Sequence, residues 1–194
     1  MRLNLGCGYR HQDGYINVDL DPVCAPQVQA DLEHARWPWD DASVDEVRMC
    51  HSLEHMGETV ATRKFVMQEM YRVLKPGGLV NIAIPWHKHA FFWNDPTHVW
   101  PITVEQLMLF DRALNQWNRE HFSAHTPLAE YWGIDLRIVP NSVEYHLDQN
   151  GEVGKQLSAG QISQAEVHRR AESDWGVVME VSLQMRKYPL EAPE

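Results

Sequence analysis

The sequence predicts an α/β fold, a Rossmann-like doubly wound sheet that is mostly parallel. Short apolar segments alternate with helical patterns over the first 85 residues. The run Leu79 to Ile84 is apolar except for Asn81, which favours a strand covered on both faces. Strands that alternate with helices form parallel sheets joined by right-handed crossovers. These observations favour one α/β domain over an all-α or all-β protein.

The first half contains four predicted strands and one clear helix. The strands are expected at 2–5, 15–19, 44–49 and 79–84. Residues 59–74 repeat apolar side chains at helical spacing, so that one face of the helix is apolar. The helix is expected to end at Lys75-Pro76-Gly77-Gly78, which combines a cation, a proline and turn glycines.

The second half begins with a stretch that has no clean period. Residues 86–101 are rich in Trp, His, Phe and Asp and are interpreted as a long loop, which is often functional. The capping-box pattern Thr103 to Gln106 opens a second helix. The apolar face of this helix contains Leu107, Phe110, Leu114 and Trp117. Two further strands are expected at 134–139 and 177–185, separated by a polar insertion at 148–172 that holds a short helix.

Length and composition indicate a single domain of 194 residues. It divides into a cofactor-binding half (1–85), a lid loop with a helix (86–133) and the C-terminal strands (134–194). The formal net charge of −10 argues against a nucleic-acid partner, since such proteins usually carry a basic patch.

A cytoplasmic location fits the composition. No apolar run approaches the roughly 20 residues that cross a bilayer, so no membrane partner is expected. The first residues already belong to the first predicted strand, which leaves no room for a signal peptide. Cys7, Cys24 and Cys50 are odd in number and lack CxxC spacing, which suits a reducing compartment.

The glycine turn after the first strand is the strongest functional signal. Gly6-Cys7-Gly8 is followed by Asp19 at the end of the second strand. Glycines allow a close backbone approach to a ligand, and a carboxylate accepts hydrogen bonds from ribose hydroxyls. A dinucleotide is disfavoured because His11 occupies the third glycine position and Asp19 comes too early. A nucleoside cofactor without phosphate, S-adenosylmethionine, fits better.

Five motifs appear in an order and spacing that resemble a known family. They are LNLGCG, YINVDLDP, ADLEHARWPWDDASVDEV, CHSLEHM and EMYRVLKPGGLVNIAIP, and with the residues around them they cover roughly residues 1–111. The chain resembles the class I S-adenosylmethionine-dependent methyltransferases, particularly small bacterial type-11-like members. The resemblance implies seven strands, with the last antiparallel and paired to the sixth. One departure is the short segment 9–14, where the family has a helix.

The resemblance also implies roles for individual residues. Gly6 and Gly8 would line the methionine part of the cofactor, and Asp19 would hold the ribose. Asp31 and Leu32 would frame the adenine, while His51 would lie beside the sulfonium. The expected cofactor-binding residues are Leu5, Gly6, Gly8, Asp19, Leu20, Asp31, Leu32 and His51.

The candidate catalytic residues are His51 and His98. Methyl transfer needs a base only if the nucleophile arrives protonated, so the sequence underdetermines their roles. His51 follows a strand end, and His98 lies in the tryptophan-rich loop, which is interpreted as a lid over the substrate. A metal held by His51 with His87, His89, Asp95 and His98 is the less favoured interpretation, and no metal site is predicted.

The favoured hypothesis is a methyltransferase that uses S-adenosyl-L-methionine to methylate an O or N atom of a small molecule or peptide. The alternative is a non-catalytic S-adenosylmethionine-binding or regulatory module with the same fold. A nicotinamide oxidoreductase is a third, weaker hypothesis because of the missing glycine. The tryptophan-rich loop would also allow packing against a second chain as a homodimer.

Overall fold

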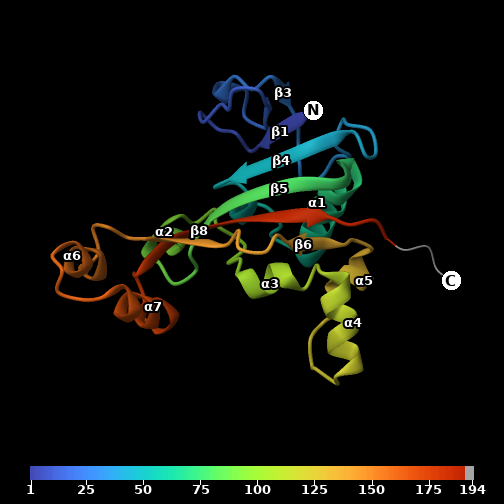
Figure 1. Ribbon diagram of the computed structural model, residues 1–194. Helices are drawn as coiled ribbons and strands as arrows, with labels where there is room; N and C mark the ends of the chain where they lie inside the picture. The colour runs from blue at the N-terminus through green and yellow to red at the C-terminus, as the bar shows by residue number, and fades with distance from the viewer. Residues whose placement is uncertain (191–194) are drawn as a thin grey trace.

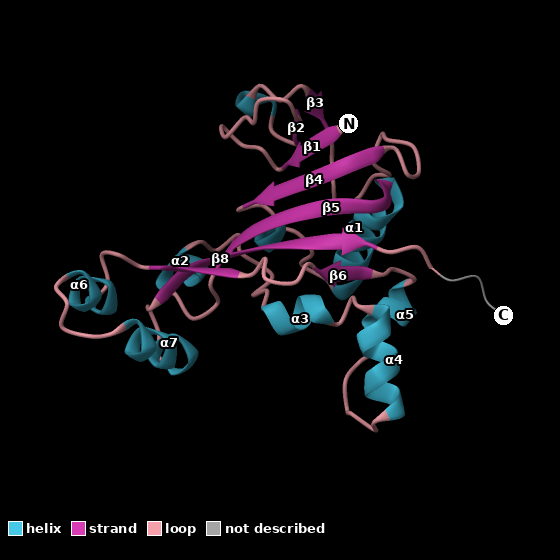
Figure 2. Cartoon of the chain, in the orientation of Figure 1, coloured by secondary structure: helices cyan, strands magenta, loops and turns pink. Residues whose placement is uncertain are grey.

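The computed structural model describes residues 1–190, in which the strands form one mixed sheet (Figure 1; Figure 2). The strands are β1 (Arg2–Leu5), β2 (Ile16–Asp19), β3 (Val28–Gln29), β4 (Val44–Cys50), β5 (Leu74–Pro85), β6 (Leu136–Ile138), β7 (Glu144–Leu147) and β8 (Val178–Lys187). Their order in space is β3-β2-β1-β4-β5-β8-β6, and β7 also pairs with β8.

The strand pairing confirms the predicted fold class. Neighbours from β3 through β5 are parallel, and the chain reverses direction across the sheet between β1 and β4, as in doubly wound folds. β8 runs antiparallel to both β5 and β6. The sheet has eight strands rather than the seven that the resemblance implies, and neither β3 nor β7 was located from the sequence. Glu144 and Tyr145 of β7 are exposed, so this edge strand has no apolar pattern that would reveal it.

Helix α1 (Val60–Val73) packs against one face of the sheet and forms the main core with it. Thr59 caps the helix by accepting a hydrogen bond from the backbone N–H of Thr62. The residues that α1 buries in this core are Val66, Met67, Met70, Tyr71 and Val73. They meet Val80, Ile82 and Ile84 of β5, which point to the same face.

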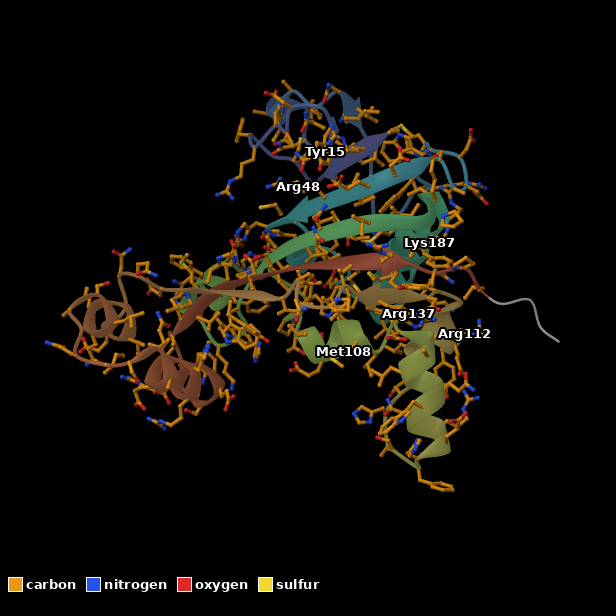
Figure 3. The ribbon with its side chains drawn as sticks, in the orientation of Figure 1. Tyr15, Arg48, Met108, Arg112, Arg137 and Lys187 are labelled. Atoms are coloured by element: carbon orange, nitrogen blue, oxygen red, sulfur yellow. The ribbon has the colours of Figure 1, made fainter. Side chains whose placement is uncertain are left out.

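The face opposite α1 carries a ladder of polar side chains, and Figure 3 labels Tyr15 and Arg48 there. Its hydrogen bonds join Asn4 to Asn17 (2.8 Å), Arg48 to Asn4 (3.2 Å), Asn81 to Glu46 (2.5 Å) and Gln184 to Asn81 (2.8 Å). Asn81 and Ala83 of β5 are therefore only half-buried. The expectation that the run 79–84 is covered on both faces is wrong, because its alternate residues face this ladder.

Two boundaries in the middle of the chain differ from the prediction. β5 begins at Leu74, directly after α1, so Lys75 to Gly78 belong to a strand with an irregular register rather than to a free turn. The helix expected after Thr103 is two helices, α3 (Val104–Met108) and α4 (Arg112–Glu120). Asp111 interrupts the apolar period because its carboxylate caps α4 by accepting from Leu114 N–H.

The remaining segments contain short helices. The loop at 86–101 includes α2 (Ala90–Asn94), which the sequence did not predict. The polar insertion holds two helices rather than one, α6 (Glu152–Ser158) and α7 (Gln164–Ser173). The other short elements are α5 (Leu128–Trp132) and the single 3-10 turns η1 (Pro22–Cys24) and η2 (Leu53–His55). None of the helices formed by residues 1–190 has the length and apolar character that crossing a bilayer requires.

Candidate active site

A cavity of about 310 Å³ lies at the carboxyl ends of β1, β2 and β4. In open α/β sheets this is the edge at which ligands bind, next to the point where the strand order reverses. The cavity is lined by Gly6, Gly8, Asp19, Leu20, Ala30, Asp31, Leu32, Glu33, His51, Ser52, His55 and Met56. Seven of the eight expected cofactor-binding residues therefore meet here; Leu5, which is fully buried, is outside the lining.

Both positions of the glycine turn have a backbone conformation that favours glycine, and Gly6 also has a close neighbour. Gly6 has a positive φ of 63°, and a Cβ there would lie 2.5 Å from the Cβ of Ser52. The Ser52 hydroxyl in turn donates to the Leu5 carbonyl at 2.9 Å, which holds η2 against β1. Gly8 also has a positive φ of 47°, but a Cβ on it would meet no atom within 4 Å. Gly6 thus permits close packing, whereas Gly8 leaves its side of the turn open.

Asp19 ties the second strand to the glycine turn. One carboxylate oxygen accepts from Gly8 N–H at 2.7 Å, and the other accepts from Asp21 N–H at 3.0 Å. A carboxylate offers about four acceptor positions, so lone pairs remain for the two hydroxyls of a ribose. Leu20, the next residue, is 60% exposed at the rim of the cavity.

Asp31 and Leu32 form the opposite wall. The Asp31 carboxylate accepts from the backbone N–H groups of Glu33 (2.9 Å) and His34 (3.0 Å). The bond from Glu33 is the main reason that the pKa of Asp31 lies below its usual range. The Trp37 indole donates to the Leu32 carbonyl at 2.9 Å, which fixes this wall to the core.

His51 leaves β4 in a left-handed conformation, with φ 53°, that is uncommon for a residue other than glycine. Its Nε2 lies 2.5 Å from Glu180 of β8, and its Nδ1 lies 3.5 Å from Glu54. Glu54 is the largest cause of a raised pKa at His51, and Glu180 adds to it, while burial opposes both. The surroundings therefore favour the protonated ring, which donates hydrogen bonds rather than accepting a proton.

The other predicted histidines separate into two places. His98 is outside the lining of the cavity, but its ring lies 4.5 Å, centroid to centroid, from that of His55, which lines it. His89 instead faces Asp148 at 3.4 Å, and His87 lines a different cavity beside Trp86. The structure therefore does not gather His51, His87, His89, Asp95 and His98 into one cluster.

Three residues at this site were not singled out from the sequence. Ser52 and Glu54 lie inside the CHSLEHM motif, where their spacing from His51 was an available signal. Glu180 lies 129 residues from His51 in the sequence and comes from the last strand. No local pattern could have revealed that contact, because it depends on the position of β8 in the sheet.

Comparison with known proteins supports the resemblance. Residues 3–82 match the family model of a methyltransferase domain. Comparison with curated protein sequences finds no match.

The solved structures that resemble this chain share its fold at low sequence identity. A SAM-dependent methyltransferase from Archaeoglobus fulgidus is 17% identical, with 96% of this chain and 85% of that chain covered and a TM-score of 0.60. The YcgJ protein from Bacillus subtilis is 14% identical, with 97% and 92% covered and a TM-score of 0.53. The [4+2]-cyclase SpnF is 18% identical, with 96% and 75% covered and a TM-score of 0.54. The family match and the fold together confirm the predicted resemblance to class I S-adenosylmethionine-dependent methyltransferases.

Proposed function

We propose that this chain binds S-adenosylmethionine in the cavity at the carboxyl ends of β1, β2 and β4. It then transfers the methyl group to an O or N atom of a small molecule or peptide. The observation that carries the proposal is the convergence of Gly6, Gly8 and Asp19 on one cavity, within the segment that matches a methyltransferase domain. A solved neighbour described as a SAM-dependent methyltransferase supports the choice of cofactor.

The lining residues fit the three parts of that cofactor. The open space at Gly8 accommodates the methionine portion close to the backbone, where a side chain would intrude. Asp19 has acceptor positions left for the ribose hydroxyls. Asp31 and Leu32 provide a carboxylate and a backbone N–H on the wall proposed for adenine. The exposed side chain of Leu20 would lie against the nucleoside from the rim.

The chain's own contribution to catalysis is mainly alignment and exclusion of water. When bound, the cofactor supplies an electrophilic methyl group whose leaving group is a neutral thioether. His51 lies on the side of the cavity expected to face that methyl group, and its contacts with Glu54 and Glu180 keep the ring in place. Because both ring nitrogens face carboxylates, we infer that His51 shapes this wall of the cavity and does not take a proton from the acceptor. His98, whose ring packs beside that of His55, is the second candidate for contacting the acceptor.

Calorimetry with S-adenosylmethionine and with S-adenosylhomocysteine tests the binding step. Saturable binding of both at one site per chain is expected, and no binding of either at millimolar concentration would refute the proposal. NADH serves as the control ligand, and a fluorescence change with NADH alone would favour an oxidoreductase instead.

A second experiment separates catalysis from binding. The protein is incubated with a methyl-labelled cofactor and a cell extract, and label in any small molecule or peptide is measured. Transfer that requires the protein supports the enzyme. Cofactor binding without any labelled acceptor would favour the alternative, a non-catalytic binding or regulatory module. The fold alone does not decide between the two, because one fold hosts unrelated functions, and a protein described as a [4+2]-cyclase shares this one.

A further inference from the structure

Glu54 is a buried carboxylate without a hydrogen-bond partner. Its side chain is 1% exposed, and neither oxygen has a partner among the described residues. The nearest cationic candidates are His51 Nδ1 at 3.5 Å and His98 Nε2 at 4.0 Å. Buried carboxylates in proteins are paired, hydrogen-bonded or bound to a metal. Both of these contacts are to Oε1, so Oε2 has no charged partner within 4.0 Å among residues 1–190.

In its neutral form, His98 turns the lone pair of one ring nitrogen toward this carboxylate. Its Nδ1 lies 2.8 Å from the carbonyl oxygen of Phe92, which can only accept, so Nδ1 carries the hydrogen. In the neutral ring Nε2 then keeps its lone pair, and this is the atom 4.0 Å from Glu54. A histidine that donates its other N–H to a backbone carbonyl has the arrangement typical of metal ligands.

His55 is fixed in the same way by a chain of hydrogen bonds. The Thr97 hydroxyl donates to Asp95 at 2.6 Å, so it accepts from His55 Nδ1 at 2.8 Å. The remaining nitrogen of His55 therefore also keeps its lone pair when the ring is neutral. One ring nitrogen of His55, one of His98 and a carboxylate oxygen of Glu54 thus gather around the same space.

The backbone holds these three residues together from two distant segments. Glu54 and His55 are adjacent in η2, whereas His98 follows α2, which lies on the side of the sheet toward which β4 and β5 point (Figure 1). The N–H groups of Val99 and Trp100 both donate to the Glu54 carbonyl, at 2.9 and 3.1 Å. These two hydrogen bonds between the backbone segments place His98 beside Glu54 before any ligand binds.

We propose that Glu54, His55 and His98 form a site for a divalent transition-metal ion of the zinc class. One ligand atom from each residue lies within 4.8 Å of the others. Ligands on one tetrahedral zinc ion lie roughly 3.4 Å apart, so small side-chain rotations close the site. Two histidines and one carboxylate form a ligand set that zinc and iron(II) both accept, with positions left open.

The open position would face the proposed cofactor cavity, because His55 lines that cavity while Glu54 is buried behind it. A lone pair on the acceptor's O or N atom would take this position and be held next to the methyl group. This role rests on the proposed function, but metal binding itself does not. From the sequence, His98 groups with other loop histidines and no metal is expected; Glu54 joins it only in the fold.

Metal titration of the untagged, chelator-treated protein tests the proposal without any cofactor. We expect one Zn²⁺ per chain by equilibrium dialysis with elemental analysis. Co²⁺, used as a spectroscopic probe, should give visible absorption bands of a four- or five-coordinate site. Glu54→Gln and His98→Ala should each weaken Zn²⁺ binding by about 100-fold or more, since each removes a direct ligand.

His121→Ala is the matched control, because His121 is an exposed histidine at the end of α4 and its loss should leave binding unchanged. If Glu54→Gln does not fold by circular dichroism, His55→Ala, which changes a half-exposed side chain, should show the same loss. Less than about 0.1 equivalents of Zn²⁺ at micromolar concentration, or wild-type affinity in the folded ligand variants, would overturn the site. Zinc binding without S-adenosylmethionine binding would instead refute only the proposed function.

Discussion

Asp19→Ala is expected to weaken S-adenosylmethionine binding by about 1.5–3 kcal/mol, the range for hydrogen bonds to a charged group. That range corresponds to a dissociation constant raised by about 10- to 150-fold. The structure gives the reason, because Asp19 lines the cavity and uses one bond from Gly8 and one from Asp21, with acceptor positions left for a ribose.

Asp21→Ala is the control for that measurement. Asp21 is exposed and does not line the cavity. Within residues 1–190, its carboxylate accepts a hydrogen bond only from Val23 N–H. Both variants are titrated by calorimetry, and thermal unfolding is measured in parallel, since Asp19→Ala also removes the acceptor of Gly8 N–H. Unchanged affinity for Asp19→Ala, or an equal loss for Asp21→Ala, would show that the ribose is held elsewhere.

Two further predictions concern stability and titration. Gly6→Ala should lower the free energy of unfolding in urea by about 2–5 kcal/mol, from a left-handed backbone and the contact with Ser52. Gly8→Ala should cost only about 1–2 kcal/mol, and an equal loss for the two would contradict the role given to Ser52. Lys75 and the amino terminus lower the pKa of Asp45 to about 2, so its stabilising contribution is present above pH 3.8 and lost as pH falls through 2. NMR titration should show this midpoint, and Lys75→Met should raise it; an unshifted midpoint would refute the ion pair.

The sequence predicts well those features that depend on neighbouring residues. Gly6, Gly8 and Asp19 meet at one cavity because each lies at or just after the end of a strand, and parallel strands end at the same edge. The α1 helix begins one residue after the predicted Thr59, which is its cap. Such signals are local, so periodicity and capping chemistry are sufficient to read them.

The features that the sequence does not predict depend on competition between local structures or on contacts between residues far apart in the sequence. Asp111 splits an apolar helical period because its cap bond to Leu114 outweighs continuation of the helix. The contact of His51 with Glu180 requires β8 to lie beside β5, which no short segment encodes. The sequence does not single out Glu54, because burial without a hydrogen-bond partner is a property of the folded chain.

The position of β8 has a consequence for how the protein is made. This strand is synthesised after every other strand, yet it lies between β5 and β6 rather than at an edge. Until residues 178–187 leave the ribosome, one edge of β5 has no strand to pair with. The side-chain hydrogen bond between Asn81 and Gln184 joins residues that are 103 positions apart in the sequence. Such late, long-range pairing is slow and exposes strand edges to wrong partners. The contact of Glu180 with His51 forms in the same step, so a nascent chain fixes His51 at the cavity only when its sheet is complete.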